Sequence, residues 1–371
     1  MLESFLPEDI AVDESHFNAG KLCIPYFFPK LLFRLSCLPL GRIFHIIGEQ
    51  ASFKSTFAAE LARWHLMGKG KAFFIDTEGK TAHHIYQSLL GNAFAESFIV
   101  RSVTSLDSWM RVIVSCVEKI EQLLEKGGTI GPLALIIDSV AGTNSLQSLI
   151  EMKDKEHYCV DRFSREAKYI SDFLRTISSR LSRLPMSLIF VNHKKVRIGQ
   201  NFVPVKATLG GSEIRFYSSF ELDLVKAKGD VYLDGTSDYR LSIMVEKNSY
   251  GASGIGISVP VVFNKEGVKF NWHAALVEWL ESLSTDWVKA KKSSDLEAKI
   301  KNIFDVSVRS GGRKGKLYYC DSIGITSDKA MPSEELGLFI EQNCKEELKL
   351  LQKILAIPDF DSSETSEENL H

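Results

Sequence analysis

The chain has 371 residues, of which 44% are hydrophobic and 25% are charged, and its formal net charge is −2. This composition is typical of a soluble globular protein with a large core, and the length suggests two domains. The six cysteines form no Cys-x-x-Cys pair, which argues against a zinc or disulfide framework and for a reducing compartment. No apolar run approaches the ~20 residues of a membrane span, and the acidic N-terminus lacks a signal-peptide pattern, so we expect a cytoplasmic protein without a membrane partner.

The N-terminal region precedes the first clear motif. Residues 1–20 are polar and acidic with isolated apolar side chains. We interpret residues 1–35 as a short arm, either a frayed terminus or a segment that contacts another subunit. Residues 37–42, Cys-Leu-Pro-Leu-Gly-Arg, place a proline and a glycine two residues apart and predict a turn that leads into the next strand.

The central motif runs over residues 45–56. An apolar run ends at Gly48, and after five residues comes Lys54-Ser55-Thr56, followed by a helix-forming sequence. A strand, a loop and a helix start form the context of a phosphate-binding P-loop, because unpaired N–H groups at a helix N-terminus carry partial positive charge. Lys54 would reach the β- and γ-phosphates, and the Ser55 hydroxyl would hold Mg²⁺. The expected nucleotide-binding residues of this loop are Gly48, Glu49, Gln50, Ala51, Ser52, Phe53, Lys54, Ser55 and Thr56.

One position of the loop departs from the P-loop pattern. Phe53 stands where a glycine is expected before the lysine. Taken alone, the stretch is therefore also compatible with a strand-to-helix turn that contains an incidental lysine.

Two later apolar runs end in carboxylates. Residues 71–78 end in Asp76-Thr77-Glu78, and residues 133–139 end in Asp138-Ser139. Both predict buried parallel strands whose carboxyl ends open toward the ligand side of a sheet. A strand can end in Asp for turn reasons alone. Downstream of a P-loop, however, the second run is typical of a Walker B strand whose aspartate binds Mg²⁺. Residues 106–124 lie between the two runs and have helical periodicity.

A third buried strand over residues 187–193 ends at His193 and leads into a basic segment. The strand is preceded by residues 164–184, which predict an amphipathic helix with a cationic face. Residues 194–209 have no clear periodicity and no acidic residue, carry Phe202 near the middle, and are followed by two glycines. Cations and an aromatic side chain are what a loop that binds single-stranded nucleic acid needs. Taken alone, the segment favours an ordinary surface loop.

The remaining chain predicts strands over residues 239–245 and 255–263. Residues 286–316 are basic, with nine Lys or Arg against four Asp or Glu, and residues 310–316 are typical of a cationic hairpin tip. Residues 333–356 have an amphipathic helical pattern. The tail over residues 359–371 has five acids and no Lys or Arg, which predicts disorder.

In combination, these motifs resemble the RecA family of recombinases over roughly residues 20–275. The resemblance rests on Pro39-Leu40-Gly41-Arg42 before the P-loop, on Asp76-Thr77-Glu78, and on Ile137-Asp138-Ser139-Val140. Ser52-Phe53-Lys54-Ser55 matches the phage-type, UvsX-like members. The resemblance implies that the phenylalanine is a feature of that lineage and not a broken site.

The resemblance implies ATP and Mg²⁺ as cofactors. Glu78 matches the glutamate that activates the attacking water, and Tyr86 matches the tyrosine that stacks on adenine. His193 stands at the position that senses the γ-phosphate, and Lys247 matches the lysine that reaches the neighbouring subunit's ATP in a filament. We therefore expect Lys54, Glu78, His193 and Lys247 as catalytic residues, and Ser55 and Asp138 as metal-binding residues.

The resemblance also implies two DNA-binding loops. The first falls near residues 156–163, and basic residues follow it. The second follows His193 and matches the corresponding loop of bacterial RecA without a gap. The expected DNA-binding residues are Lys168, Arg175, Lys194, Lys195, Arg197, Gly199, Phe202, Gly210 and Gly211.

The fold that the resemblance implies is α/β. We expect a RecA-type P-loop ATPase core with a mostly parallel central sheet over residues 36–275 and a smaller C-terminal α/β domain with a basic face over residues 276–358. Three departures from the family stand out. Residues 1–20 have no clear counterpart of the bacterial polymerisation helix, Ser249 replaces a cation, and the region after residue 275 matches no family segment closely.

The implied function is that of an ATP-dependent DNA strand-exchange recombinase in homologous recombination and DNA repair. Its partners would be single-stranded DNA, homologous duplex DNA and further copies of the chain in a helical filament. This function is also compatible with a single-strand-binding protein and a loader protein as partners. If the chain is phage-encoded, it would act in the cytoplasm of a bacterial host.

Two alternatives stay open. The first is a RecA-fold ring helicase or recombination mediator, against which the gapless second loop and Glu78 argue. The second is a non-enzymatic regulator. The intact site residues argue against it, namely Lys54, Ser55, Glu78 and Asp138.

Overall fold

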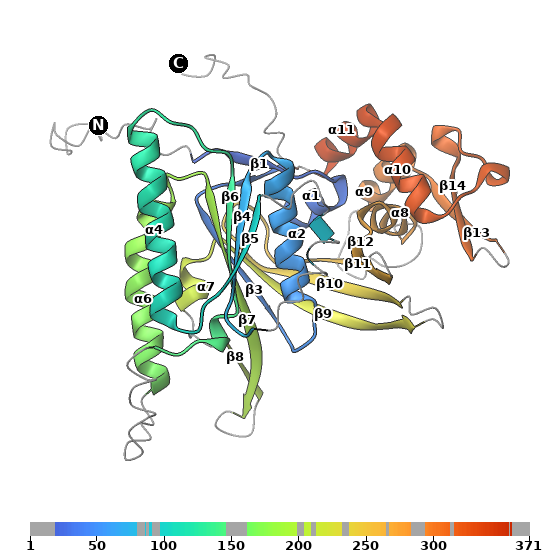
Figure 1. Ribbon diagram of the computed structural model, residues 1–371. Coiled ribbons are helices and arrows are strands. Elements are labelled where there is room, and N and C mark those ends of the chain that lie inside the picture. The colour runs from blue at the N-terminus through green and yellow to red at the C-terminus, as the bar shows by residue number, and fades with distance from the viewer. Residues whose placement is uncertain are drawn as a thin grey trace, which may run out of the picture.

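A ten-stranded sheet runs through the centre of the molecule (Figure 1). Its strands lie in the order β12-β11-β10-β9-β3-β7-β6-β4-β5, and β8 pairs with β7 outside this path. The computed structural model describes residues 19–79, 86, 89–90, 97–145, 162–198, 204–208, 213–231, 237–264, 267–282, 294–311, 315–355 and 357.

The part of the sheet from β9 to β5 is parallel. Its strands are β9 (Phe220–Val231), β3 (Arg42–Gly48), β7 (Met186–Ile198), β6 (Leu133–Asp138), β4 (Lys71–Asp76) and β5 (Phe98–Ser102). The strands predicted from the three apolar runs are confirmed as β4, β6 and the first half of β7. Gly48 pairs with His193, and Asp76 pairs with Asp138. The polar strand ends therefore meet at one edge of the sheet, where ligands bind in open parallel sheets.

Antiparallel strands extend the sheet beyond β9. They are β10 (Ser237–Asn248), β11 (Ile255–Asn264) and β12 (Gly267–Phe270), and the first two confirm the predicted strands. The β9–β10 register changes between the pairs Asp238–Asp230 and Arg240–Ala227, so two residues of β9 stand opposite Tyr239. A bulge of this kind bends the strand and redirects side chains locally.

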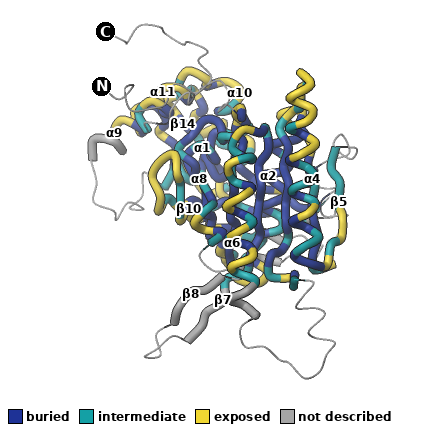
Figure 2. The backbone as a smooth tube through the Cα atoms, turned by 90° about the vertical axis from the view of Figure 1, so that its left-hand side faces the viewer, coloured by how far each residue is buried: buried dark blue, intermediate teal, exposed yellow. Residues whose placement is uncertain are grey.

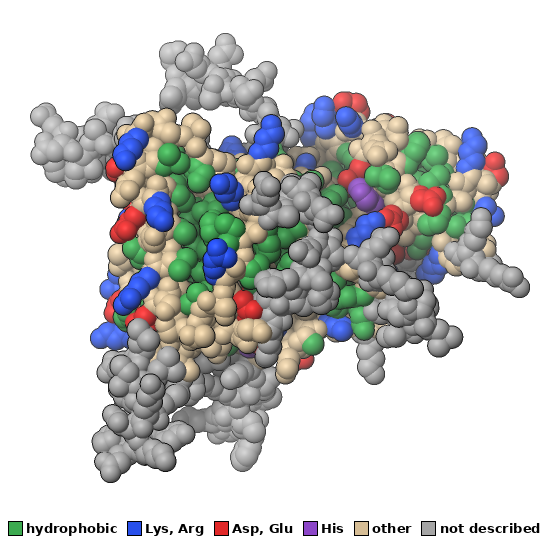
Figure 3. All heavy atoms as spheres, in the orientation of Figure 1, with side chains coloured by type: hydrophobic (Ala, Val, Ile, Leu, Met, Phe, Trp, Pro, Cys, Tyr) green, Lys and Arg blue, Asp and Glu red, His purple; other side chains and the backbone are tan. Residues whose placement is uncertain are grey.

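Helices cover both faces of the parallel strands. The helices α4 (Leu106–Glu125) and α6 (Arg162–Leu181) lie together on one face, and α2 (Lys54–Met67) lies on the other (Figure 1). Both α4 and α6 were expected from their periodicity. The strands between the helices are buried, whereas β5 at the edge is partly exposed (Figure 2). Along α4, basic and acidic side chains are intermingled on the surface (Figure 3).

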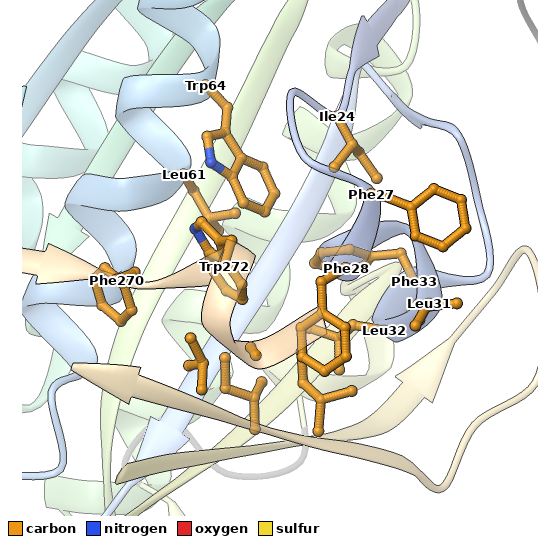
Figure 4. Close-up of a cluster of buried hydrophobic side chains, with 14 of the residues drawn as sticks. Ile24, Phe27, Phe28, Leu31, Leu32, Phe33, Leu61, Trp64, Phe270 and Trp272 are labelled. Carbon is orange, nitrogen blue, oxygen red and sulfur yellow. The ribbon is translucent and has the colours of Figure 1, made fainter. Parts of the chain in front are cut away.

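A large hydrophobic cluster with several aromatic side chains joins the N-terminal elements to α2 and α8 (Figure 4). The elements that meet there are β1 (Lys21–Cys23), α1 (Phe27–Phe33), β2 (Cys37–Pro39) and α8 (Trp272–Ser282). Trp64 and Trp272 each donate their indole N–H to Glu60 Oε1 at 2.9 Å, and Arg63 pairs with the other carboxylate oxygen at 2.9 Å. These partners satisfy a carboxylate that would otherwise be costly to bury. Residues 19–33 of the expected arm therefore contribute to the core.

The turn predicted before β3 is confirmed. Gly41 has a φ of +71°, and a Cβ atom at this position would lie 2.7 Å from the carbonyl oxygen of Leu181. Only glycine fits both the backbone conformation and the close approach of α6.

The C-terminal elements share this hydrophobic cluster with the sheet. They are α9 (Ser294–Ile303), β13 (Val306–Ser310), β14 (Lys316–Cys320), the short 3₁₀ turns Asp321–Ile323 and Ser327–Lys329, α10 (Ser333–Asn343) and α11 (Lys345–Ile354). Leu336 and Ile340 of α10 pack in the same cluster as the buried side chains of α8. Because α8 spans the expected boundary at residue 275, no break in packing marks that position. The domain division stays a prediction.

Two details of this region can be compared with the sequence. The strands on both sides of the predicted hairpin tip pair as expected, with Ser310 opposite Lys316. The single helix predicted over residues 333–356 is wrong, because α10 ends at Asn343 and α11 begins at Lys345. The acidic first turn of α11 favours a new helix start, since carboxylates stabilise a helix N-terminus.

The segment after His193 begins as a β-hairpin. The sequence predicts no regular structure for residues 194–209, but β7 continues to Ile198 and pairs antiparallel with β8 (Pro204–Thr208). Val196, Ile198 and Val205 are β-branched residues, which favour strands. The side chains of residues 195–198 and 204–208 lie outside the described ones. None of the described helices is long and apolar enough to cross a membrane.

Candidate nucleotide-binding site

The loop between β3 and α2 curls around the side chain of Lys54. Ala51 and Phe53 have φ angles of 59° and 63°, in the left-handed region. The Ser52 hydroxyl donates to the Glu49 carbonyl oxygen at 2.8 Å, and the Lys54 ammonium donates to the same oxygen. The loop backbone therefore bends around the start of α2. The first N–H groups of this helix have no partners within the helix.

Gly48 at the end of β3 is needed for close packing. A Cβ atom at this position would lie 2.5 Å from the carbonyl oxygen of Leu224 in β9. The absence of a side chain allows β9 to run directly beside the loop.

Acidic groups face the loop from the neighbouring strand ends. The Ser55 hydroxyl hydrogen-bonds the Asp138 carboxylate, while burial raises the pKa of Asp138 to about 6. Burial also lowers the pKa of Lys54, and the charges of Asp138 and Glu78 oppose that shift. A half-buried carboxylate beside a hydroxyl is a donor set that fits Mg²⁺, because this ion prefers oxygen ligands.

Glu78 is held by two side chains, one from Ser139 directly after β6 and one from His193 in β7. The Ser139 hydroxyl donates to Glu78 Oε1 at 2.6 Å, and His193 Nε2 lies 3.0 Å from the same oxygen. Asp76 fixes the turn that carries Glu78, because its Oδ1 accepts the backbone N–H groups of Glu78 and Gly79 at 3.0 and 2.8 Å. The carboxylate therefore has a defined position at the mouth of the loop.

The loop and the strand ends enclose one pocket of about 1020 Å³, large enough for a nucleotide. Many of the predicted site residues line this pocket. They are Gln50, Ala51, Ser52, Phe53, Lys54, Ser55, Thr56, Glu78, Tyr86, Asp138, His193 and Lys194. Tyr86 is only 6% exposed and lies between Phe74 and Phe98, with ring centroids 4.8 and 5.9 Å away.

Sequence reasoning missed several residues of this site. Thr77 bridges the strand ends, since its hydroxyl donates to the Ser139 carbonyl at 2.6 Å and accepts the Ser139 N–H at 2.8 Å. Gly142 lets the next turn approach, because a Cβ there would lie 2.8 Å from Glu78 Cγ. Thr77 lies between Asp76 and the predicted catalytic residue Glu78, and this position in the sequence is a signal that could have identified it. Lys226 of β9 also lines the pocket, and no local sequence signal marks it.

Lys194, which was predicted to bind DNA, lines the pocket. Its ammonium pairs with Asp223 of β9. Lys195 and Arg197 lie in β7, but their side chains are outside the described residues, as are Gly199, Phe202, Gly210 and Gly211 altogether.

Three further predicted residues lie away from the pocket. Lys168 is exposed on α6. Arg175 and Lys247 line a separate surface hollow together with Arg215 and Phe216 of α7 (Glu213–Tyr217). Lys247 donates to the carbonyl oxygens of Arg215 and Phe216 at 2.8 Å, so within this chain it does not reach the P-loop.

Comparison with known protein families decides the relationship of the chain. A family model described as the RecA N-terminal domain matches residues 30–268. The chain belongs to the RecA family. The matched range of this RecA-family protein includes the loop, the strands of the central sheet from β3 to β11, the start of β12, and the helices α2, α4, α6 and α7.

The relatives of this RecA-family chain are at modest identity. It is 28% identical over 233 residues to Protein RecA of Mycoplasmopsis pulmonis, covering 62% of this chain and 63% of that protein. It is 29% identical over 238 residues to Protein RecA of Chlamydia pneumoniae, covering 62% of this chain and 61% of that protein. With Protein RecA of Mycoplasma mobile, 26% identity extends over 268 residues, 72% and 73% of the two chains. The matches thus span less than two thirds of the first two relatives.

Proposed function

We propose that the protein is an ATP-dependent DNA recombinase that assembles on single-stranded DNA, pairs it with homologous duplex DNA and exchanges strands. The observation that carries this proposal is the joint presence of Lys54, Ser55, Asp138 and the Glu78–His193 pair around one pocket. Membership of the RecA family supports the coarser part, a P-loop ATPase with RecA-like architecture.

Phosphoryl transfer needs positioning and charge stabilisation more than covalent chemistry. Lys54 and the loop N–H groups would hold the phosphates of ATP, and Ser55 and Asp138 would hold Mg²⁺. When bound, the ion neutralises charge on the β- and γ-phosphates. Glu78 would accept the proton of the attacking water, and its contacts with Ser139 and His193 orient it for that role.

His193 would connect the nucleotide with DNA. It contacts Glu78 in the pocket, and it stands in β7, which continues as a paired strand to Ile198. A change at His193 on γ-phosphate binding would therefore be passed along a hydrogen-bonded strand to the segment in which we place the second DNA loop. Lys195, Arg197, Gly199 and Phe202 would contact DNA from this segment, with Lys168 and Arg175 on α6 as further contacts.

Lys247 would act on the ATP of a neighbouring subunit. It is distant from the pocket of its own chain but lies beside Phe216, whose side chain is 72% exposed. Exposed aromatic side chains such as Phe216 are enriched in protein interfaces, which supports a subunit contact at this hollow. Hydrolysis would then require assembly.

Within the family we place the protein among the phage-type, UvsX-like recombinases. The support is the Ser52-Phe53-Lys54-Ser55 loop and the histidine at position 193.

The primary test is ATP hydrolysis with and without single-stranded DNA, with Lys54→Ala as the blank. We expect DNA to stimulate turnover of the natural protein and to leave the blank unchanged. A strand-exchange assay with ATP and with a non-hydrolysable analogue then tests whether pairing needs binding or hydrolysis. Absence of DNA-stimulated hydrolysis would contradict the proposal, and closed rings in negative-stain images would favour a ring helicase.

A further inference from the structure

Lys226 is a pocket-lining cation with no place in the mechanism above. It stands on β9 in the same pocket as the P-loop, half-buried. Its ammonium lies 3.8 Å from the ring centroid of Tyr239 and 4.8 Å from that of Phe53. Aromatic faces attract cations, so the two rings fix the position of the side chain.

The rings belong to a cluster that the fold builds at this place. Phe53 stacks on Phe263 at 5.3 Å between centroids and lies 5.6 Å from Tyr239. Tyr239 occupies the bulge between β9 and β10, and bulges redirect side chains. Phe53 thus turns its ring away from the inside of the loop and toward the antiparallel extension of the sheet.

The charge environment separates Lys226 from the other lysines of the pocket. Lys194 is paired with Asp223, and Lys54 is influenced by the charges of Asp138 and Glu78. Within the described part of the chain, the Lys226 ammonium contacts aromatic rings and pairs with no carboxylate. An anion in the pocket would supply the opposite charge that this ammonium lacks.

The strand order places Lys226 on a particular side of the pocket. Glu78 lies just after β4, and Asp138 is the last residue of β6. Both of these strands lie on one side of the P-loop strand β3, whereas β9 lies on the other side. The register of β9 puts Leu224 opposite Gly48, so Lys226 lies just beyond the end of β3. The acidic groups and Lys226 therefore flank the loop from opposite sides.

We propose that Lys226 binds the phosphate chain of the nucleotide from the side opposite the acidic groups, held in place by Tyr239 and Phe53. This inference rests on the proposed nucleotide site and adds a residue to it. It also gives Phe53 a function: its ring supports a cation that serves the ligand.

The test is equilibrium binding of ADP and of adenosine to the full chain. Lys226→Met keeps the length of the side chain and removes its charge. We expect it to weaken ADP binding about 10- to 100-fold, the loss of one charged hydrogen bond, and to leave adenosine binding unchanged. Lys226→Arg should restore most of the ADP affinity. Tyr239→Leu should weaken ADP binding less than Lys226→Met, because it removes one support of the ammonium and not the ammonium itself.

Two controls make the outcome decisive. Lys269→Met removes an exposed lysine that pairs with Glu334 outside the pocket, and it should change neither affinity. Lys54→Ala should abolish ADP binding. If Lys54→Ala does so and Lys226→Met binds ADP like the natural protein, the inference is wrong and the proposed function stands. Equal weakening of ADP and adenosine by Lys226→Met would also overturn it. If the natural protein does not bind ADP, both fail.

Discussion

At the scale of single residues, Phe53 combines an unfavourable backbone with a favourable side chain. Its φ of 63° lies in the region that glycine adopts most easily, yet its ring stacks on Phe263 and approaches Tyr239. The ring packs away from the interior of the loop, which explains how a bulky residue can stand in the place of a glycine. The two contributions act in opposite directions and can be separated by substitution.

We expect Phe53→Ala to be less stable than Phe53→Gly. Both variants lose the ring contacts, but only glycine relieves the left-handed backbone, which costs other residues about 1 kcal/mol. Urea unfolding should therefore show the alanine variant about 1 kcal/mol below the glycine variant. Phe263→Leu removes the stacking partner without changing the loop backbone and serves as the control. Equal stabilities of the two Phe53 variants would show that residue 53 is not left-handed in solution.

A substitution of Glu78 should reduce ATP hydrolysis without much change in nucleotide binding. Glu78→Gln keeps the shape and the hydrogen-bonding capacity of the side chain but removes the base, so ATP turnover should fall about 10²- to 10⁴-fold. ADP affinity should change only a few-fold, because Lys54 and the loop N–H groups remain. Turnover and ADP titration on the same preparation measure the two effects.

Ser139→Ala is the matched control for this substitution. It removes the hydroxyl that donates to Glu78 Oε1 at 2.6 Å but leaves the carboxylate. We expect a smaller loss of turnover than for Glu78→Gln. If Glu78→Gln retained full turnover, the assignment of Glu78 as the base would be wrong.

At the scale of elements, α2 carries a buried histidine as well as Lys54. His65 Nδ1 lies 2.8 Å from the Leu61 carbonyl oxygen, and Nε2 lies 2.9 Å from the Ser187 hydroxyl. The carbonyl can only accept, so Nδ1 carries the proton and the hydroxyl donates to Nε2. Burial lowers the pKa of His65 from 6.5 to about 4. The neutral ring links α2 to β7.

This histidine makes the folded protein sensitive to acid. The unfolded chain binds a proton near pH 6.5, whereas the folded chain does so only near pH 4, so the free energy of unfolding falls as pH falls through this window. The loss between pH 7 and pH 4 is of order 3 kcal/mol. His65→Gln should flatten this part of the stability profile measured by urea unfolding. Ser187→Ala keeps the imidazole and should keep the acid sensitivity. A profile unchanged by His65→Gln would show that other groups cause it.

The elements also show what a sequence can predict here. The strands that end at Asp76 and Asp138, and the first half of β7 up to His193, were predictable because a buried parallel strand is a continuous apolar run. The P-loop was predictable because its residues are contiguous. The position of Lys226 was not, because it depends on the pairing of β9 with β3 and on a bulge opposite Tyr239. Such long-range register leaves no local pattern.

Two errors have the same kind of cause. The strand in residues 194–198 forms because it pairs with residues 204–208, although each half is basic and short. On the two sides of the break the helices have different partners, since α10 packs against α8 and β14 whereas α11 packs against α9. In both cases tertiary partners decided between structures that the local sequence allows.

At the scale of the whole molecule, the two surfaces of interest lie apart. The nucleotide pocket is at the strand ends, whereas Lys247 lies in the hollow with Arg175 and Phe216. A single chain cannot bring Lys247 to its own P-loop without breaking its bonds to the carbonyl oxygens of Arg215 and Phe216. A head-to-tail assembly can place the hollow of one subunit over the pocket of the next. The separation of the two sites therefore leads to a test that uses two defective chains.

We expect Lys54→Ala and Lys247→Ala to complement one another. Each variant alone should hydrolyse ATP near background on single-stranded DNA, since one lacks the phosphate-binding lysine and the other lacks the lysine supplied to the neighbour. In an equal mixture, half of the subunits have an intact loop, and about half of these adjoin a subunit with an intact Lys247. The mixture should therefore reach about a quarter of the natural turnover.

The control replaces the first partner by a chain with both substitutions, which cannot supply Lys247 to any neighbour and should restore nothing. Recovery in the first mixture and not in the second identifies a residue that acts between subunits. Full turnover of Lys247→Ala alone would exclude a role in hydrolysis. A defect in Lys247→Ala that no partner restores would assign this lysine to its own chain, where its bonds to two consecutive carbonyl oxygens would fix the end of α7.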